Sequence, residues 1–224
     1  MPLSFWRIGY TMYLKSTLLL LFIFFTSTSP LNAEEKPQNW QLVKDENGIK
    51  VYTRTLAHSD YKEFRGEMDV EAKLDALLTF IKNADRCPNW QYKCIKALTL
   101  SNGYIYKLSN LPWPLSDRYT VMQTQMHYDK QDKTYTLHLK NIERGKLSQQ
   151  ILAQLPVEND TVQMRYSDGY WQFKIDSPSI IHITYQMHGD PAGVIPVVLA
   201  NQGVTNAAFV TLSNLKNHFT AIQN

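Results

Sequence analysis

The sequence predicts an α+β fold in which a curved antiparallel sheet closes around one long C-terminal helix and encloses a hydrophobic cavity. Three observations support this fold class. Breakers cluster from Gly189 to Pro196 and no proline follows them, which indicates a long helix with Pro196 near its first turn. Upstream, short alternating segments separated by turn residues indicate strands joined as hairpins. The middle of the helix carries small residues, which are too short to fill the space beneath a curved sheet.

One face of the predicted helix is apolar over roughly 40 Å, at 100° per residue and 1.5 Å rise. Its members are Val197, Ala200, Val204, Ala207, Ala208, Thr211, Leu215, Phe219 and Ile222. Because alanine and threonine dominate its middle, either large partner side chains or an open space must lie opposite.

The rest of the chain predicts one helix and a run of strands. Strands are expected at 40–44, 49–54, 61–70, 92–100, 104–108, 118–128, 134–142, 162–166, 170–175 and 180–188, a helix at 71–82, a loop at 83–90 and a helical turn within 147–155. We expect the segments 162–166 and 170–175 to pair across Ser167-Asp168-Gly169.

The first 33 residues resemble an export signal. Lys15 precedes an apolar run from Leu18 to Phe25, and Ala33 supplies a small residue at a plausible cleavage site. The alternative is an uncleaved membrane anchor, although the run is short for a membrane span. We therefore expect a signal peptide at 1–33, a polar leader at 34–37 and one domain at 38–224, exported to the periplasm of a Gram-negative bacterium.

The charge balance argues against a nucleic-acid partner, and the two cysteines suggest a disulfide. After residue 33 the chain holds 21 basic and 20 acidic side chains, too even a balance to attract nucleic acid. Cys87 and Cys94 are a candidate disulfide in an oxidising compartment, the alternative being two separate buried thiols. Neither a metal nor a cofactor is expected, and we expect a monomer.

Two motifs resemble those of START (steroidogenic acute regulatory protein-related lipid transfer) domains. One is the segment 111–119, in which Trp113 stands between two prolines and Arg118 follows; the other is 190–196, which leads into the last helix. Trp40, the segment 48–52 and Trp90 also match, and the resemblance is closest to the phosphatidylcholine-transfer-like branch. It implies a helix-grip fold with a tunnel for one lipid.

A carrier of this kind needs an apolar wall with a few polar groups. The candidate lining residues are Met122, Thr124, Met126, Leu137, Leu139, Tyr166, Trp171, Ile183, Tyr185, Ala200, Val204, Ala207, Ala208, Thr211 and Leu215, each of which could equally be packed core. Four residues are assigned to the rim or to structure: Trp90, Trp113, Arg118 and Asp190. For Arg118 we favour a salt bridge, with Asp117 or Asp190, that fixes the proline-rich turn.

No catalytic residue is predicted. The six histidines are scattered, and neither a nucleophile elbow nor a phosphate-binding glycine loop occurs. The favoured function is a lipid-binding or lipid-transfer protein that holds one hydrophobic ligand, such as a phospholipid or a sterol, and contacts a membrane transiently. The alternatives are a cyclase- or hydrolase-like enzyme using the same cavity and an interaction domain with a filled core.

Overall fold

The computed structural model describes residues 39–223, with side chains to residue 221. The predicted signal peptide and polar leader, and the side chain of Ile222, lie outside this part. The strands are β1 (Gln41–Glu46), β2 (Ile49–Leu56), β3 (Ser59–Glu71), β4 (Cys94–Thr99), β5 (Tyr104–Ser109), β6 (Asp117–Asp129), β7 (Thr134–Asn141), β8 (Thr161–Gln163), β9 (Tyr166–Ile175) and β10 (Ile180–Asp190). The α-helices are α1 (Leu74–Lys82), α2 (Cys87–Trp90), α3 (Gln149–Leu152) and α4 (Val197–Gln223).

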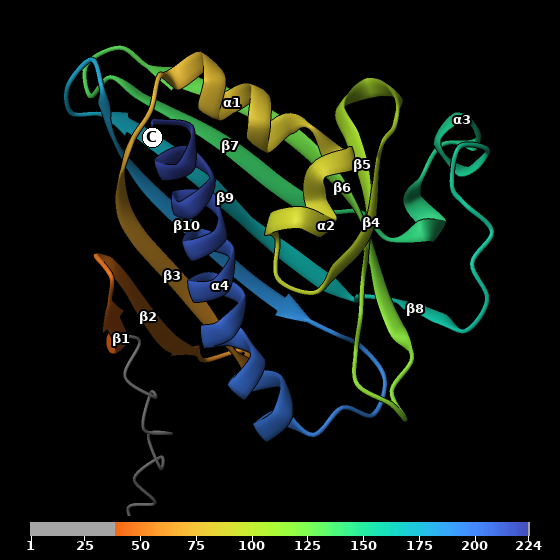
Figure 1. Ribbon diagram of the computed structural model, residues 1–224. Helices are drawn as coiled ribbons and strands as arrows, with labels where there is room; N and C mark the ends of the chain where they lie inside the picture. The colour runs from red at the N-terminus through yellow and green to blue at the C-terminus, as the bar shows by residue number, and fades with distance from the viewer. Residues whose placement is uncertain (1–38, 224) are drawn as a thin grey trace, which may run out of the picture. The chain divides into compact units, whose positions relative to one another are not determined.

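All ten strands join one curved sheet, in the order β1-β2-β3-β10-β9-β7-β6-β5-β4, with β8 beside β6. Neighbours along this path are antiparallel, as expected for strands joined by short turns. In the first hairpin, Asn47 and Gly48 have φ of 54° and 71°, the left-handed pair that a tight two-residue turn requires. Helix α4 crosses the concave face, so the predicted helix-grip architecture is confirmed (Figure 1).

One strand prediction was wrong. The segment 166–175 forms a single strand, β9, which pairs with β10 from end to end, and it does not turn at Gly169. A Cβ at Gly169 would lie 2.0 Å from the Gln186 carbonyl oxygen, so this glycine permits close approach of β10. The short strand β8 instead pairs in parallel with the start of β6. The expected loop at 83–90 also contains a 3-10 turn and α2.

The main core lies between the C-terminal half of α4 and the strands β2, β3, β9 and β10. Leu212 and Leu215 of the helix are fully buried, as are Val51 and Phe173 of the sheet. A Cβ at Gly66 of β3 would lie 2.5 Å from Leu212 Cδ1, so the absence of a side chain there lets the helix pack closely on the sheet. None of the helices in residues 39–223 is long and apolar enough to cross a membrane.

Two further features fix the end of the sheet that β4, β5 and β6 form. Tyr106 and Val121, on the outer face of β5 and β6, form a second core with Leu147 and Ile151 around α3. The predicted bridge between Cys87 and Cys94 is present, with 5.9 Å between the Cα atoms, and it joins α2 to the start of β4. The wall made by β4 to β6 is therefore anchored from both sides.

Candidate ligand cavity

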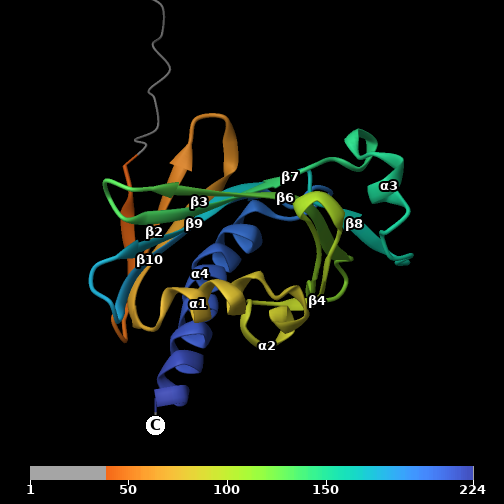
Figure 2. The same ribbon diagram turned by 90° about the horizontal axis from the view of Figure 1, so that it is seen from above.

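A cavity of about 810 Å³ lies between the concave face of the sheet and the N-terminal half of α4. Residues of β4 to β7, β9 and β10 line it. The view from above shows these strands curving around α4 (Figure 2). Most of the exposed atoms of the cavity are apolar, which is the character of a site that removes hydrocarbon from water.

Most of the predicted lining residues meet in this cavity. Its wall includes Met122, Thr124, Met126, Leu137, Leu139, Trp171, Tyr185, Ala200, Val204 and Ala207. On α4 these positions occupy the first three turns only, where Gly203 adds a further gap in the helix surface. The small residues in this half of the helix therefore lie opposite open space.

Five predicted lining residues lie elsewhere. Ala208, Leu215 and Ile183 are fully buried in the main core, because α4 approaches the sheet closely from residue 208 onward. Thr211 is buried, and its hydroxyl oxygen accepts a hydrogen bond from the Tyr92 backbone N–H at 3.1 Å. Tyr166 is 40% exposed and its ring packs beside His188, outside the cavity wall.

Aromatic residues close one end of the cavity. The Trp171 ring stacks on Tyr185 at 3.9 Å between centroids, and Trp90 packs behind Trp171 at 5.7 Å. Trp90 is 2% exposed and belongs to the core, which assigns it the structural role among the two that the sequence allowed. The Asn214 side chain of α4 donates to the Trp90 carbonyl, so the helix is tied to α2 at this point.

Arg118 joins the two loops at the cavity mouth. Its guanidinium donates to the carbonyls of Pro191 (2.6 Å), Ala192 (3.2 Å) and Ser116. The expected salt bridge with Asp117 or Asp190 was wrong: Asp117 accepts from the Leu111 N–H. Arg118 is buried, and burial lowers its pKa, while the nearby Asp117 carboxylate acts in the opposite direction. The guanidinium thus donates hydrogen bonds to backbone carbonyls that have no partner within their own loops.

Asp190 fixes the second loop. Its carboxylate accepts from the Ala192 backbone N–H at 2.8 Å and pairs with Arg165 at 2.7 Å. Arg118 therefore holds the two loops together as one unit, and Asp190 fixes the conformation of the second.

Large apolar side chains on this unit face solvent. Trp113 is 92% exposed and Val194 is 96% exposed, and the first turn of α4 adds Val198 and Leu199. The sequence left Trp113 undecided between core and mouth, and the structure places it on the outer surface of the mouth. Below, these four residues are called the mouth patch.

The comparisons with known proteins agree with this architecture. A STAR-related lipid transfer protein fragment from Xanthomonas axonopodis is 30% identical, and its crystal structure superimposes with a TM-score of 0.69 over 81% of this chain and 98% of the fragment. The chain belongs to the StAR-related lipid transfer (START) family. The human StAR-related lipid transfer protein 5, which is 14% identical, shares the START fold with a TM-score of 0.69 over 83% of this chain and 88% of its own.

An uncharacterized protein of Pseudomonas aeruginosa is 27% identical over 184 residues, which cover 80% of this chain and 86% of that protein. No family model matches the sequence.

One polar residue that lines this START cavity, Lys107, was not predicted from the sequence. Lys107 lies on the inner face of β5 with Ile105 and Ser109, whereas Tyr106 and Leu108 point to the outer core. Burial lowers the pKa of its ammonium from 10.5 to about 8. The signal was present in the sequence, because Lys107 interrupts the inward positions of a short alternating strand.

A second polar group, His188, lies where the cavity meets the β2–β3 hairpin. It is 7% exposed, and its Nε2 lies 3.0 Å from the Ser59 hydroxyl. Burial lowers the pKa of the imidazole, partly offset by Glu63, so the neutral ring is favoured near pH 7. Ser59 itself does not belong to the cavity wall.

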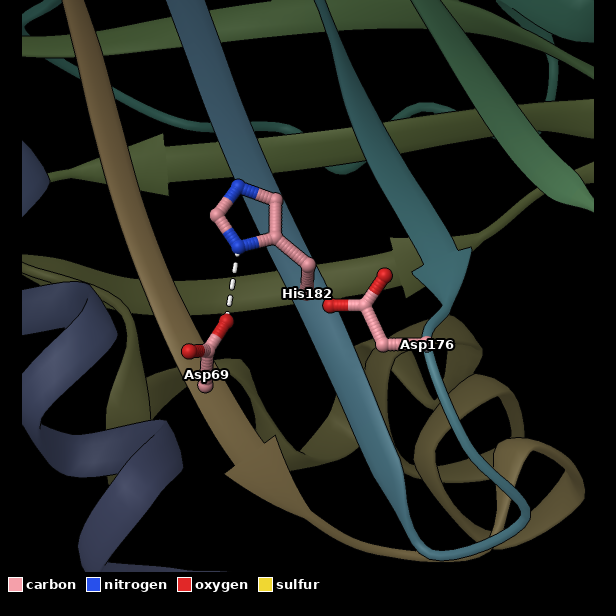
Figure 3. Close-up of side chains that lie close together, drawn as sticks. All are labelled: Asp69, Asp176 and His182. Atoms are coloured by element: carbon pink, nitrogen blue, oxygen red, sulfur yellow. Dashed lines mark hydrogen bonds and ion pairs between the residues drawn. The ribbon is translucent and has the colours of Figure 1, made fainter. Parts of the chain in front are cut away.

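A separate cluster lies on the outer face of the sheet. His182 Nδ1 is 2.7 Å from an Asp69 carboxylate oxygen, and Asp176 approaches from the β9–β10 turn (Figure 3). Ligand atoms of the three residues lie within 4.8 Å of one another. Both carboxylates are exposed, and His182 stands on the face of β10 opposite Ile181 and Ile183, as the alternation predicted. This cluster is remote from the cavity wall.

Proposed function

We propose that the protein is a non-enzymatic lipid carrier that holds one hydrophobic ligand between the sheet and the first half of α4. The observation that carries the proposal is the apolar cavity of about 810 Å³ in a START fold. Folded proteins normally pack their interiors without such space, so a cavity of this size indicates a ligand-binding site and not a packing defect.

The volume limits the ligand. A volume of this size falls within the range of small-molecule sites, and it can hold one acyl chain with its head group, or one sterol.

The mouth patch provides the transient membrane contact. Trp113 and Val194 stand at the tips of the two loops that Arg118 ties together, and apolar side chains so exposed are costly in water. Tryptophan also favours the interface between lipid and water. Membrane binding through this unit would bring the cavity mouth to the lipid surface. We propose that the carrier acts as a monomer in the periplasm, as the export signal and the disulfide suggest.

A hydrolase or cyclase in the same cavity is the less favoured alternative. The pair formed by His188 and Ser59 has the spacing of a general base and a nucleophile. However, Ser59 lies outside the cavity wall, and its hydroxyl oxygen also accepts from the Tyr61 backbone N–H. These contacts support a structural role for the pair, which fixes the β2–β3 hairpin.

A vesicle transfer assay tests the carrier function. Donor vesicles carrying a fluorescent single-chain lipid are mixed with unlabelled acceptors, and transfer is followed with and without the mature protein. Catalytic amounts of the protein should accelerate transfer, and the recovered lipid should be chemically unchanged. The variant Trp113→Ser should transfer more slowly while binding soluble ligand normally. Hydrolysed or cyclised product would favour the enzyme, and no acceleration by the wild type would contradict the proposal.

A further inference from the structure

A lysine faces the apolar cavity without a partner from the protein. Lys107 projects from the middle of β5 into the wall that Ile105 and Met122 otherwise make apolar. Among the hydrogen bonds and ion pairs of residues 39–221, none involves its side chain. Its nearest lysine along the neighbouring strand, Lys96, points the other way and pairs with Glu158 at 3.0 Å.

The whole cavity wall is biased towards positive charge. It includes the side chains of Lys62, Lys82, Lys93, Lys107 and Arg118, while no aspartate or glutamate is found among the described residues that line it. Lys82 and Lys93 are exposed, so water solvates them. Lys107 differs from these because it is only partly exposed and stands within the sheet, and no carboxylate of the described residues pairs with it.

A buried threonine stands opposite Lys107 on the neighbouring strand. Thr120 of β6 is directly opposite Lys107 in the antiparallel register, so both side chains are on the cavity face of the sheet. Thr120 is 4% exposed, and its oxygen has no hydrogen-bond partner. Thr120 is not among the residues that line the cavity, whereas Lys107 lines it without an ion-pair partner from the described residues, so an anionic ligand group would supply that partner.

We propose that the cavity binds an anionic amphiphile with one acyl chain, and that Lys107 pairs with its carboxylate or phosphate. This inference rests on the proposed carrier function and specifies its ligand class. The acyl chain then extends from β5 along Met126 and Leu137 towards α4. The pKa of about 8 leaves roughly nine in ten ammonium groups charged at pH 7.

The test compares charged and uncharged ligands of one chain length. Palmitate, 1-palmitoyl lysophosphatidate and 1-palmitoylglycerol are titrated into the delipidated protein and followed by calorimetry. The wild type should bind at least one of the two anions roughly tenfold or more tightly than the glycerol ester, because a charge-assisted hydrogen bond distinguishes them. The anion that binds more tightly identifies the carboxylate or the phosphate as the group recognised.

Two variants assign the effect to Lys107. Lys107→Met should lose the preference for the anion and keep its affinity for palmitoylglycerol, whereas Lys107→Arg should retain part of the preference. Lys82→Met, which removes the same charge from an exposed position of the wall, should bind both ligands as the wild type does. Lys107→Met should fold, because it replaces a partly exposed, unpaired charge by an apolar chain of similar length; Lys107→Gln serves if it does not.

The outcomes separate this inference from the carrier function. Unchanged anion preference in Lys107→Met, or a wild type that prefers the uncharged ester, would overturn the ligand assignment and leave the carrier intact. Failure of the wild type to bind any of the three amphiphiles, or a sterol tested alongside, would contradict the carrier function itself.

Discussion

The two halves of α4 face the same sheet and carry a similar apolar stripe, yet they have different surroundings. From residue 208 onward, Leu212, Leu215 and Phe219 are buried against β2, β3 and α1. Before it, Ala200, Val204 and Ala207 lie opposite a cavity. The C-terminal half supplies stability and the N-terminal half forms a binding wall. A continuous apolar face on a helix therefore does not by itself indicate continuous packing.

Gly66 and the polar contacts explain how one straight helix does both. The helix packs closely on β3 where Gly66 leaves room for Leu212. At the other end, Asn201 accepts from the Lys62 N–H and donates to the Asp60 carbonyl, which fixes the first turns to the β2–β3 hairpin. Both ends are held, so the cavity persists between the helix and the far wall of the sheet.

The same substitution in the two halves should give the largest contrast. Leu215→Ala removes a fully buried side chain and should lower the free energy of unfolding by about 2–5 kcal/mol. Leu199→Ala, at a position 53% exposed, should change it by less than about 1 kcal/mol. Urea unfolding of both variants measures the difference. Equal losses would show that the N-terminal half is packed like the core.

Ligand binding on the cavity side should respond to pH. The folded pKa of Lys107 is lowered to about 8, and an anion favours the charged ammonium, so affinity should be complete below pH 8 and fall several-fold as pH rises from 8 to 9.5. Calorimetric titration of palmitate across this range gives the profile. Stability should move the opposite way: in the empty protein the folded state disfavours the charged lysine, so unfolding free energy rises with pH above 8.

Lys107→Met supplies the control for this pH profile. This variant keeps the other titratable or charged groups of the cavity wall, which are Tyr61, Lys62, Lys82, Tyr92, Lys93, Tyr104, Arg118, Tyr185 and His188. Its profile should lose the fall above pH 8. A fall of the same size in the variant would assign the pH dependence to one of those groups.

The smallest expected effect concerns the surface of the two halves. Val198→Ser, in the exposed first turn of α4, should weaken binding to phospholipid vesicles a few-fold, because about 68% of this apolar side chain meets solvent. Ala221→Ser at the other end of the helix is exposed but remote from the mouth patch, and should leave binding unchanged. Vesicle sedimentation measures both. Equal losses would mean that the membrane contact is not confined to the mouth patch.

The architecture was predictable because alternation and breakers act locally. The strand alternation predicted the inward residues Met122, Leu137 and Trp171, and the breakers before Pro196 marked the start of α4. Gly169 was read as a turn because the role of a glycine depends on the neighbouring strand, here the approach of Gln186, which lies 17 residues away in sequence.

The site was predictable only in part, because the apolar face of a helix does not show how closely the helix packs on the sheet. Ala207 and Ala208 are adjacent and chemically identical, yet one lines the cavity and the other is fully buried. Which of the two alanines is buried depends on where Gly66 lets α4 pack closely on β3. Arg118 was recognised as structural, but two of its three carbonyl partners belong to a loop more than 70 residues away. Lys107 could be placed in the cavity only once the inward face of β5 was known.

The most direct measurement is native mass spectrometry of the mature chain purified without detergent, compared with its Ala207→Trp and Ala221→Trp variants. Ala207 lies in the cavity wall, and Ala221 is exposed on the same helix outside it. We expect one lipid-sized mass increment per chain in the wild type and in Ala221→Trp, and none in folded Ala207→Trp. An increment that persists in folded Ala207→Trp would contradict a ligand held between the sheet and the first half of α4.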